Sequence, residues 1–410
     1  MLSILKTRSP LASPLRVLRH PQFRRYWAGV TVSSLGTWTQ VVAQSLLVLE
    51  ISGNSPVALG WVSLASAAAF LVFALVGGSL ADRLDKRRLL LLTQSLQLLI
   101  ALGLGVLTLT GWVSLWQVIG LAFLGGLIAS VDQPARAAFL PLLVPKDELL
   151  TATSLNAIVM NTASTLGPVL AGLLVGTLGL ALGFFLNALS FLAMLWALAG
   201  LLTPPAPAQA VKRSGSEALE GLRVIRSDLV LSGVVLGYGA LLLLGPSPSF
   251  MIPLFAATRL HLDGAGMGLL FGAVGTGTVL GAFLMAFLGN LPRKERWFAL
   301  ALLGWSLALG GFALSRSLWL SLLALLLLGV LRNFSGTLAT TLMQLRSPQE
   351  ARGRVMSVNT WLSGGVRPLG DFGVSLLMAA LPLSGAVLLG SASVGMFGAV
   401  LALRHHRGEG

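Results

Sequence analysis

Three charged residues interrupt long apolar runs in the second half of the sequence: Arg332, Arg367 and Asp371. A charge at the centre of a bilayer costs at least about 2.5–3.5 kcal/mol, so each side chain needs a partner or a water-filled cavity. Arg367 and Asp371 lie one helical turn apart and can share a face, within reach of Arg332 on a neighbouring helix. One interpretation is a static ion-pair cluster. The other is that Asp371 exchanges a proton as its arginine partners leave and return, because a carboxylate without its partner in an apolar site binds a proton more readily.

Two further acidic residues are candidates for the same proton exchange. Asp132 and Arg136 are also one turn apart, at the end of an apolar run, and Glu50 ends the first long run. Asp132 and Arg136 can form an ion pair that only anchors a helix end, and an acid at a membrane interface is often simply solvated. Asp371 is therefore the first candidate, followed by Glu50 and Asp132.

Amide side chains offer a second kind of chemistry. Gln40 and Gln44 lie one turn apart near the middle of the first apolar run, which places them on one face near the bilayer midplane. They can hydrogen-bond a neighbouring helix, or they can line a cavity that binds a substrate. Asn161 and Asn333 are further candidates for such a cavity.

Metal, thiol and nucleotide chemistry find no support in the sequence. Cysteine is absent, and the four histidines are scattered or terminal (His20, His261, His405 and His406). No Gly-x-x-x-x-Gly-Lys-Ser/Thr loop is present to hold ATP. We therefore expect no enzyme, metal or cofactor, and any uphill transport must use an ion gradient or a partner protein.

The composition is that of a membrane protein with many spans. Of 410 residues, 55% are hydrophobic and 10% charged, whereas an ordinary soluble domain has about 25% charged residues. The apolar runs predict an all-α polytopic protein with twelve transmembrane helices, near 27–50, 57–81, 89–110, 113–140, 151–177, 181–202, 229–258, 265–288, 297–314, 317–345, 355–380 and 384–403.

The net charge of +14 is concentrated on one side of the predicted membrane. Most Lys and Arg residues fall in the N-terminal segment, in alternate loops, in the central linker and in the tail. By the positive-inside rule, both termini are then cytoplasmic and the number of spans is even. The charge thus reflects contact with the lipid bilayer, and we expect no binding to nucleic acid.

A proline-containing linker divides the chain into halves. Residues 1–26 read as a cytoplasmic segment with a short surface helix near 18–27, and residues 203–228 read as a linker with a capping box at Ser214–Glu217 and an amphipathic helix. Six-helix halves at 27–202 and 229–403 precede a cytoplasmic tail at 404–410. Short matches between the halves, about 200 residues apart, indicate a parallel repeat.

The segment Gly78-Ser79-Leu80-Ala81-Asp82-Arg83-Leu84-Asp85-Lys86-Arg87-Arg88 lies between two apolar runs. It resembles the loop between helices two and three of the major facilitator superfamily, Gly-x-Leu-Ala-Asp-Arg-x-Gly-Arg-Lys, and it departs from that pattern at Asp85. This departure and the segment 132–141 are similar to the branch that contains bacterial macrolide-efflux and enterobactin-export proteins. The resemblance implies an inner gate formed by Gly78, Asp82, Arg83, Lys86 and Arg87. As the alternative to its local pair with Asp132, Arg136 can engage Asp82 across this gate.

A second segment, residues 163–172, resembles the Gly-Pro-x-x-Gly-Gly motif of antiporters in this superfamily. It matches at Gly167, Pro168 and Gly172, and Ala171 replaces one glycine. A proline frees a backbone carbonyl and bends a membrane helix, while small neighbours allow close helix packing.

The resemblance implies a monomeric secondary transporter in a bacterial cytoplasmic membrane. We expect it to export amphiphilic, drug-like small molecules by alternating access, in exchange for protons. A siderophore or lysophospholipid transporter of the same fold is the alternative. From a different class of protein, a non-transporting membrane receptor or scaffold would keep the buried charges as purely structural groups.

Overall fold

The computed structural model describes residues 14–201, 216–288 and 291–407, and every regular element in them is helical. Eleven helices in this part of the chain are long and apolar enough to cross a membrane. One further crossing, the eleventh span in chain order, is assembled from α13 (Arg352–Trp361), a π-helical turn (Leu362–Val366) and α14 (Arg367–Ala380). The predicted all-α, twelve-span fold is confirmed. The prolines of the linker and Ser214 of the predicted capping box lie outside the described residues.

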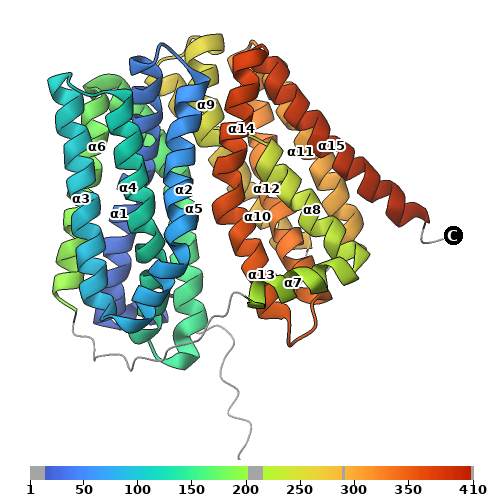
Figure 1. Cartoon of the computed structure of the whole chain (residues 1–410), viewed down its shortest axis with the longest axis horizontal. Coiled ribbons are helices and arrows are strands. Elements are labelled where there is room, and N and C mark those ends of the chain that lie inside the picture. The colour runs from blue at the N-terminus through green and yellow to red at the C-terminus, as the bar shows by residue number, and fades with distance from the viewer. Residues whose placement is uncertain (1–13, 202–215, 289–290, 408–410) are drawn as a thin grey trace, which may run out of the picture.

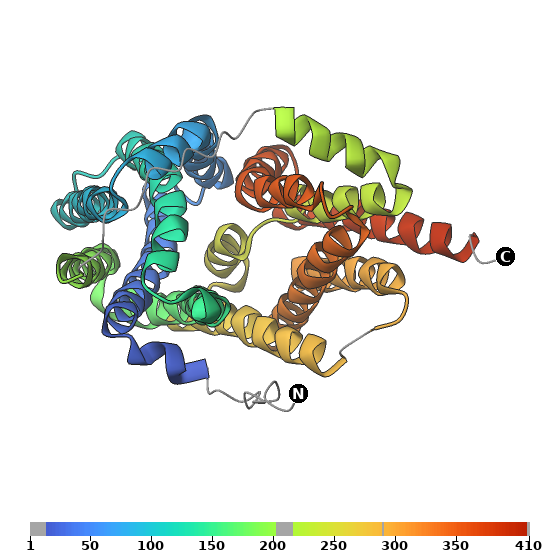
Figure 2. The ribbon, with the colours of Figure 1, turned by 90° about the horizontal axis from the view of Figure 1, so that it is seen from below.

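Two six-helix halves lie side by side (Figures 1 and 2). The first contains α1 (Pro21–Ile51), α2 (Pro56–Arg83), α3 (Lys86–Thr110), α4 (Leu115–Phe139), α5 (Leu149–Leu178) and α6 (Leu180–Ala199). The second contains α8 (Leu229–Leu244), α9 (Pro248–Phe255), α10 (Gly264–Leu288), α11 (Lys294–Leu314), α12 (Leu318–Arg346), α13, α14 and α15 (Leu383–Arg407). Between the halves in sequence comes α7 (Ser216–Ser227), which packs against α13.

The start of the first span differs from the prediction. A short 3-10 helix covers Pro14–Arg19, and α1 then runs without a break from Pro21 to Ile51. No separate surface helix over 18–27 forms, because Pro21 is well suited to begin a helix: its missing N–H would have had no partner in the first turn.

The helices of the two halves pair in the same way. In the first half α2 packs on α4, and α6 packs on α1 and α3; in the second half α10 packs on α12, and α15 packs on α8 and α11. Helix two of one half therefore corresponds to α10 of the other, and helix six to α15. This correspondence is the structural form of the sequence repeat.

Consecutive spans alternate in direction, so basic segments gather on one side of the molecule (Figure 1). We call it the basic side; it carries the α2–α3 turn, the start of α5, α7 and the start of α13, with Arg83, Lys86, Arg87, Arg88, Lys146, Arg352 and Arg354. In Figure 1 the basic side is at the bottom of the molecule, where α7 and α13 lie. The first and second halves meet through α2 with α14, α5 with α10 and α1 with α9.

These contacts between the halves gather toward the side opposite the basic side. The rings of Trp61, in the second turn of α2, and Phe372 of α14 lie 5.0 Å apart between centroids. On the same side of the molecule, Gly172 near the C-terminal end of α5 approaches Gly268 near the start of α10 so closely that a Cβ on Gly172 would lie 2.6 Å from the Gly268 Cα. On the basic side, α13 packs instead against α7 and α12 of its own half.

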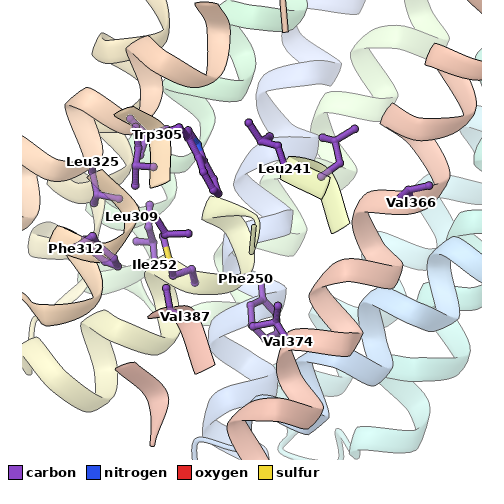
Figure 3. Close-up of a cluster of buried hydrophobic side chains, with 14 of the residues drawn as sticks. Leu241, Phe250, Ile252, Trp305, Leu309, Phe312, Leu325, Val366, Val374 and Val387 are labelled. Carbon is purple, nitrogen blue, oxygen red and sulfur yellow. The ribbon is translucent and has the colours of Figure 1, made fainter. Parts of the chain in front are cut away.

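The seventh span is broken in its middle. Its two parts, α8 and α9, are separated by Gly245, Pro246 and Ser247, and Pro248 begins α9. Because prolines lack an N–H, the α-helical hydrogen-bond ladder cannot continue through this segment. Apolar side chains surround the break, among them Leu241, Phe250 and Trp305 (Figure 3).

Candidate functional site

A cavity of about 880 Å³ lies between the two halves, toward the basic side. Its walls come from α1, α5, α8, α10, α12 and the eleventh span, and they include apolar and polar side chains: Trp38, Val41, Asn161, Thr165, Pro168, Tyr238, Leu241, Phe271, Arg332, Asn333, Thr337, Arg367 and Asp371. Volumes of 300–1,000 Å³ are typical of small-molecule sites, so the cavity can enclose a drug-sized ligand.

Asp371 is held at the break in the seventh span. Only 5% of the residue is exposed. Its Oδ1 accepts a hydrogen bond from the Ser247 backbone N–H at 2.7 Å, and its Oδ2 accepts one from the Ser247 hydroxyl at 2.8 Å. The same hydroxyl oxygen accepts from the Phe250 N–H at 3.2 Å, so Ser247 caps α9 while it binds Asp371.

The arginines expected beside Asp371 do not pair with it. No ion pair joins Asp371 to Arg332 or Arg367 in the described part of the chain. The Nε of Arg367 is buried without a hydrogen-bond partner. Since the carboxylate is already occupied by Ser247, the cavity presents two guanidinium groups that are available to a ligand, and a buried unpaired charge favours a counter-charge.

A smaller cavity of about 320 Å³ adjoins the first. It lies among α1, α2, α3 and α4 and is lined mainly by neutral polar and apolar side chains, including Gln40, Gln44, Ser45, Ser63, Ser66, Gln97 and Leu104. Val41, Ser247, Ser249, Pro368 and Asp371 line both cavities. The structure thus brings all four predicted amide candidates to the cavities, with Asn161 and Asn333 in the larger one.

Asp132 lies elsewhere, in a closed network at the basic end of the first half. Its Oδ1 accepts hydrogen bonds from the Thr93 hydroxyl at 2.6 Å and the Gln94 amide at 2.8 Å, and its Oδ2 accepts from the Arg136 Nε at 2.5 Å. The predicted ion pair with Arg136 is therefore present. The side chain of Asp82 lies outside the described residues, and Glu50 is exposed at the end of α1, away from both cavities.

The basic turn is attached to its own half. Asp85 caps α3 by accepting the Arg88 N–H at 2.8 Å, which accounts for an acid where glycine was expected. Arg87 donates to the carbonyl oxygens of Leu198 and Ala199 at 2.9 and 2.7 Å, at the C-terminal end of α6. The side chain of Arg83 is exposed to solvent. These contacts stabilise the turn, and the gate role of Asp82, Arg83, Lys86 and Arg87 stays a prediction.

In the predicted gate motif, the glycine that packs closely against another helix is Gly77 and not the predicted Gly78. A Cβ on Gly78 would meet open space, whereas a Cβ on Gly77 would lie 2.2 Å from the Ser130 carbonyl oxygen of α4.

Sequence reasoning also missed Ser247, although the surrounding sequence Gly-Pro-Ser-Pro indicated a break in the helix. Of the predicted helix bend, Gly167 packs within the first half, where a Cβ would lie 2.5 Å from the Trp38 Cβ of α1, and Pro168 lines the larger cavity.

Comparisons with known proteins agree with this arrangement. Residues 12–407 match the model of the family described as transmembrane secretion effector. The enterobactin exporter of Citrobacter koseri is 28% identical over 386 residues, covering 93% of this chain and 90% of the relative. The enterobactin exporter of Escherichia coli O127:H6 is also 28% identical over 386 residues, with the same shares covered.

The similar solved structures are transporters of the same fold. A bacterial homologue of the iron transporter ferroportin, in an inward-facing state, superposes with a TM-score of 0.73 at 17% identity, covering 93% of this chain and 98% of the other. A bacterial homologue of the lysosomal transporter Spinster, inward-facing and unoccupied, gives a TM-score of 0.65 at 13% identity, covering 93% and 95%.

Proposed function

We propose that the chain, which belongs to the transmembrane secretion effector family of major facilitator transporters and is therefore an efflux transporter, exports amphiphilic, drug-like small molecules that carry negative charge, in exchange for protons. The observation that carries this proposal is the cavity of about 880 Å³ between the halves, which has apolar side chains in its walls and two arginines that form no ion pair with the described residues. Apolar walls bind the hydrophobic part of the cargo, and the arginines select the sign of its charge.

The charge of the cavity favours an anion over a cation. Arg332, Arg367 and Asp371 are the charged residues that line it, so its formal charge is positive. The N-terminal end of α9, whose backbone dipole is positive, lies at Ser247 on the same wall. A phenolate, carboxylate or phosphate is thus preferred. Siderophores of the kind exported by the relatives are candidate cargo for this reason, as are lysophospholipids.

Asp371 supports the proton part of the proposal. It is the acidic residue that lines the cargo cavity in the described part of the chain, and its bonds to Ser247 cross between α14 and the break in the seventh span. A relative movement of these helices would separate the pair and change the proton affinity of the carboxylate. One proton moving down about 100 mV releases about 2.3 kcal/mol, enough for a cargo gradient of about fifty-fold.

Orientation in the membrane follows from the basic side. If it faces the cytoplasm, as the positive-inside rule requires, both termini are cytoplasmic and the cavity takes up cargo from inside the cell. Monomeric function is part of the proposal, because both halves of the cavity come from one chain.

Transport into inverted membrane vesicles tests the proposal. Vesicles acidified by ATP hydrolysis are offered carboxyfluorescein, an anion, or ethidium, a cation, and lumenal fluorescence is followed with and without a protonophore. We expect proton-dependent accumulation of carboxyfluorescein well above that of ethidium. Accumulation of ethidium alone would contradict the charge assignment. Binding of carboxyfluorescein to purified protein without any accumulation would favour the receptor or scaffold alternative.

A further inference from the structure

The smaller cavity has a different chemistry from the larger one. Apart from Asp371 in the shared wall, its lining contains no ionisable side chain, and three glutamines from α1 and α3 face it. The cavity volume of about 320 Å³ is too small for the whole of a drug-sized molecule but sufficient for part of one. It therefore suits a neutral polar group that belongs to a larger ligand.

One glutamine is available to bind such a group. Gln40 accepts a hydrogen bond from the Asn187 amide at 2.7 Å, and the Gln97 amide donates to the Gly125 carbonyl oxygen at 3.3 Å. Gln44, one turn after Gln40, makes no side-chain hydrogen bond to the described residues and is half-buried in the cavity wall. A primary amide offers both a donor and an acceptor, so its natural partner is another amide, which has the same two groups.

We propose that the smaller cavity is a second binding subsite, which takes an uncharged amide group of the cargo through Gln44. This inference rests on the proposed function, because it places the anionic part of the same molecule with Arg332 and Arg367 in the larger cavity. The preferred cargo is then an amphiphile that carries both an acidic group and an amide group. N-acylated amino acids and aryl amides with an acidic group have this chemistry.

The position of the subsite links recognition to Asp371. Asp371 and Ser247 lie in the wall that both cavities share, between the arginines and the glutamines. A molecule that occupies both cavities must pass this wall and contact the pair. Cargo with both groups therefore contacts the Asp371–Ser247 pair from both cavities at once.

A matched pair of small anions tests the subsite. Hippurate and 4-phenylbutanoate have the same chain length and charge, and they differ in that hippurate has an amide where 4-phenylbutanoate has two methylenes. Their binding to the purified full-length protein in lipid nanodiscs is measured by calorimetry, and their inhibition of carboxyfluorescein uptake is measured in vesicles. We expect hippurate to bind roughly five- to tenfold more tightly, the effect of an amide hydrogen-bond pair.

Two variants locate the effect. Gln44→Leu keeps the size of the side chain and removes both hydrogen-bonding groups, so hippurate should lose its advantage while 4-phenylbutanoate binds as before. Gln344→Leu changes an exposed glutamine of α12 outside both cavities and should keep the advantage. Melting temperatures of both variants report whether they are folded.

The outcomes separate the subsite from the proposed function. Equal binding of the two anions to the wild type, or an advantage that survives in a folded Gln44→Leu variant, would overturn the subsite even if carboxyfluorescein is transported. An advantage lost only in Gln44→Leu supports it. If carboxyfluorescein is not transported at all, the proposed function fails, and the calorimetry still decides whether the amide is recognised.

Discussion

Each half of the molecule contains an aspartate and an arginine one helical turn apart, and only one of the two forms an ion pair. In the first half, Asp132 precedes Arg136 and the two are bonded. In the second half, Arg367 precedes Asp371, and the aspartate bonds to Ser247 of another helix instead. Side chains of a helix lean toward its N-terminus, so an arginine reaches back to an acid that precedes it and away from one that follows.

The order of the two residues therefore separates a structural pair from a reactive one. Asp132 has three donors on its two oxygens, including a charged one. Asp371 has both donors from a single serine at a helix break, and the nearby arginines are left to the cavity. The comparison indicates that the first half is held rigid at its basic end, while the second half keeps its charges available for cargo and protons.

The largest effect is expected on stability, when the Asp132–Arg136 ion pair is broken. Arg136→Met leaves the buried Asp132 carboxylate without its charged partner, and breaking a buried pair in this way costs about 3–5 kcal/mol. Thermal unfolding of the detergent-solubilised protein should show a correspondingly large loss. Arg367→Met is the matched control from the other half and should melt close to the wild type. Similar melting of both variants would remove the distinction between the two pairs.

Asp371→Asn should abolish coupling without unfolding the protein. The asparagine keeps the shape of the side chain and can still accept the Ser247 hydroxyl, but it cannot carry a proton. Accumulation of carboxyfluorescein in acidified vesicles should fall by about fifty-fold, the contribution of one proton across about 100 mV. Exchange of carboxyfluorescein across the membrane without a proton gradient should continue. A proton-driven gradient retained in this variant would move the coupling to Glu50 or Asp132.

Arg367→Gln should weaken the binding of anions. A hydrogen bond to a charged group contributes about 1.5–3 kcal/mol, so the Kd of carboxyfluorescein should rise by at least tenfold. Ethidium provides the internal control, because its binding should stay the same or improve. Equal weakening for both dyes would indicate a general disturbance of the cavity and count against a charge-selective role.

The smallest effect is expected at the basic turn. Asp85→Ala removes the cap of α3 and should cost about 1 kcal/mol of stability, whereas Asp85→Gly should cost only a few tenths. The difference can be measured as a difference in melting temperature between the two variants. A larger loss of transport than of stability in Asp85→Ala would show that the turn has a role beyond holding α3, as the gate prediction requires.

Much of the fold was accessible from the sequence because membrane spans are long apolar runs with charged ends. The residues deep in the apolar runs were also identified, since their cost in a bilayer marks them. Ser247, the hydrogen-bond partner of Asp371, was not identified from the sequence. Ser247 lies in a different span, and only the break after Leu244 brings its N–H and hydroxyl to the carboxylate. Likewise, Arg87 binds the end of α6 because two helices distant in sequence pack together, which no local pattern encodes.

The π-helical turn at Leu362–Val366, just before Arg367, has a mechanical consequence. Such a turn holds one residue more than an α-helical turn, so the residues after it are offset by one position from a regular α-helix. Conversion of the turn to α-helix would remove this offset and rotate α14 by about 100° about its own axis, without unfolding either end. This rotation would carry the Asp371 side chain away from Ser247 and break their hydrogen bonds. Spin labels at the exposed positions Trp361 and Leu369 would detect the rotation as a change in their separation.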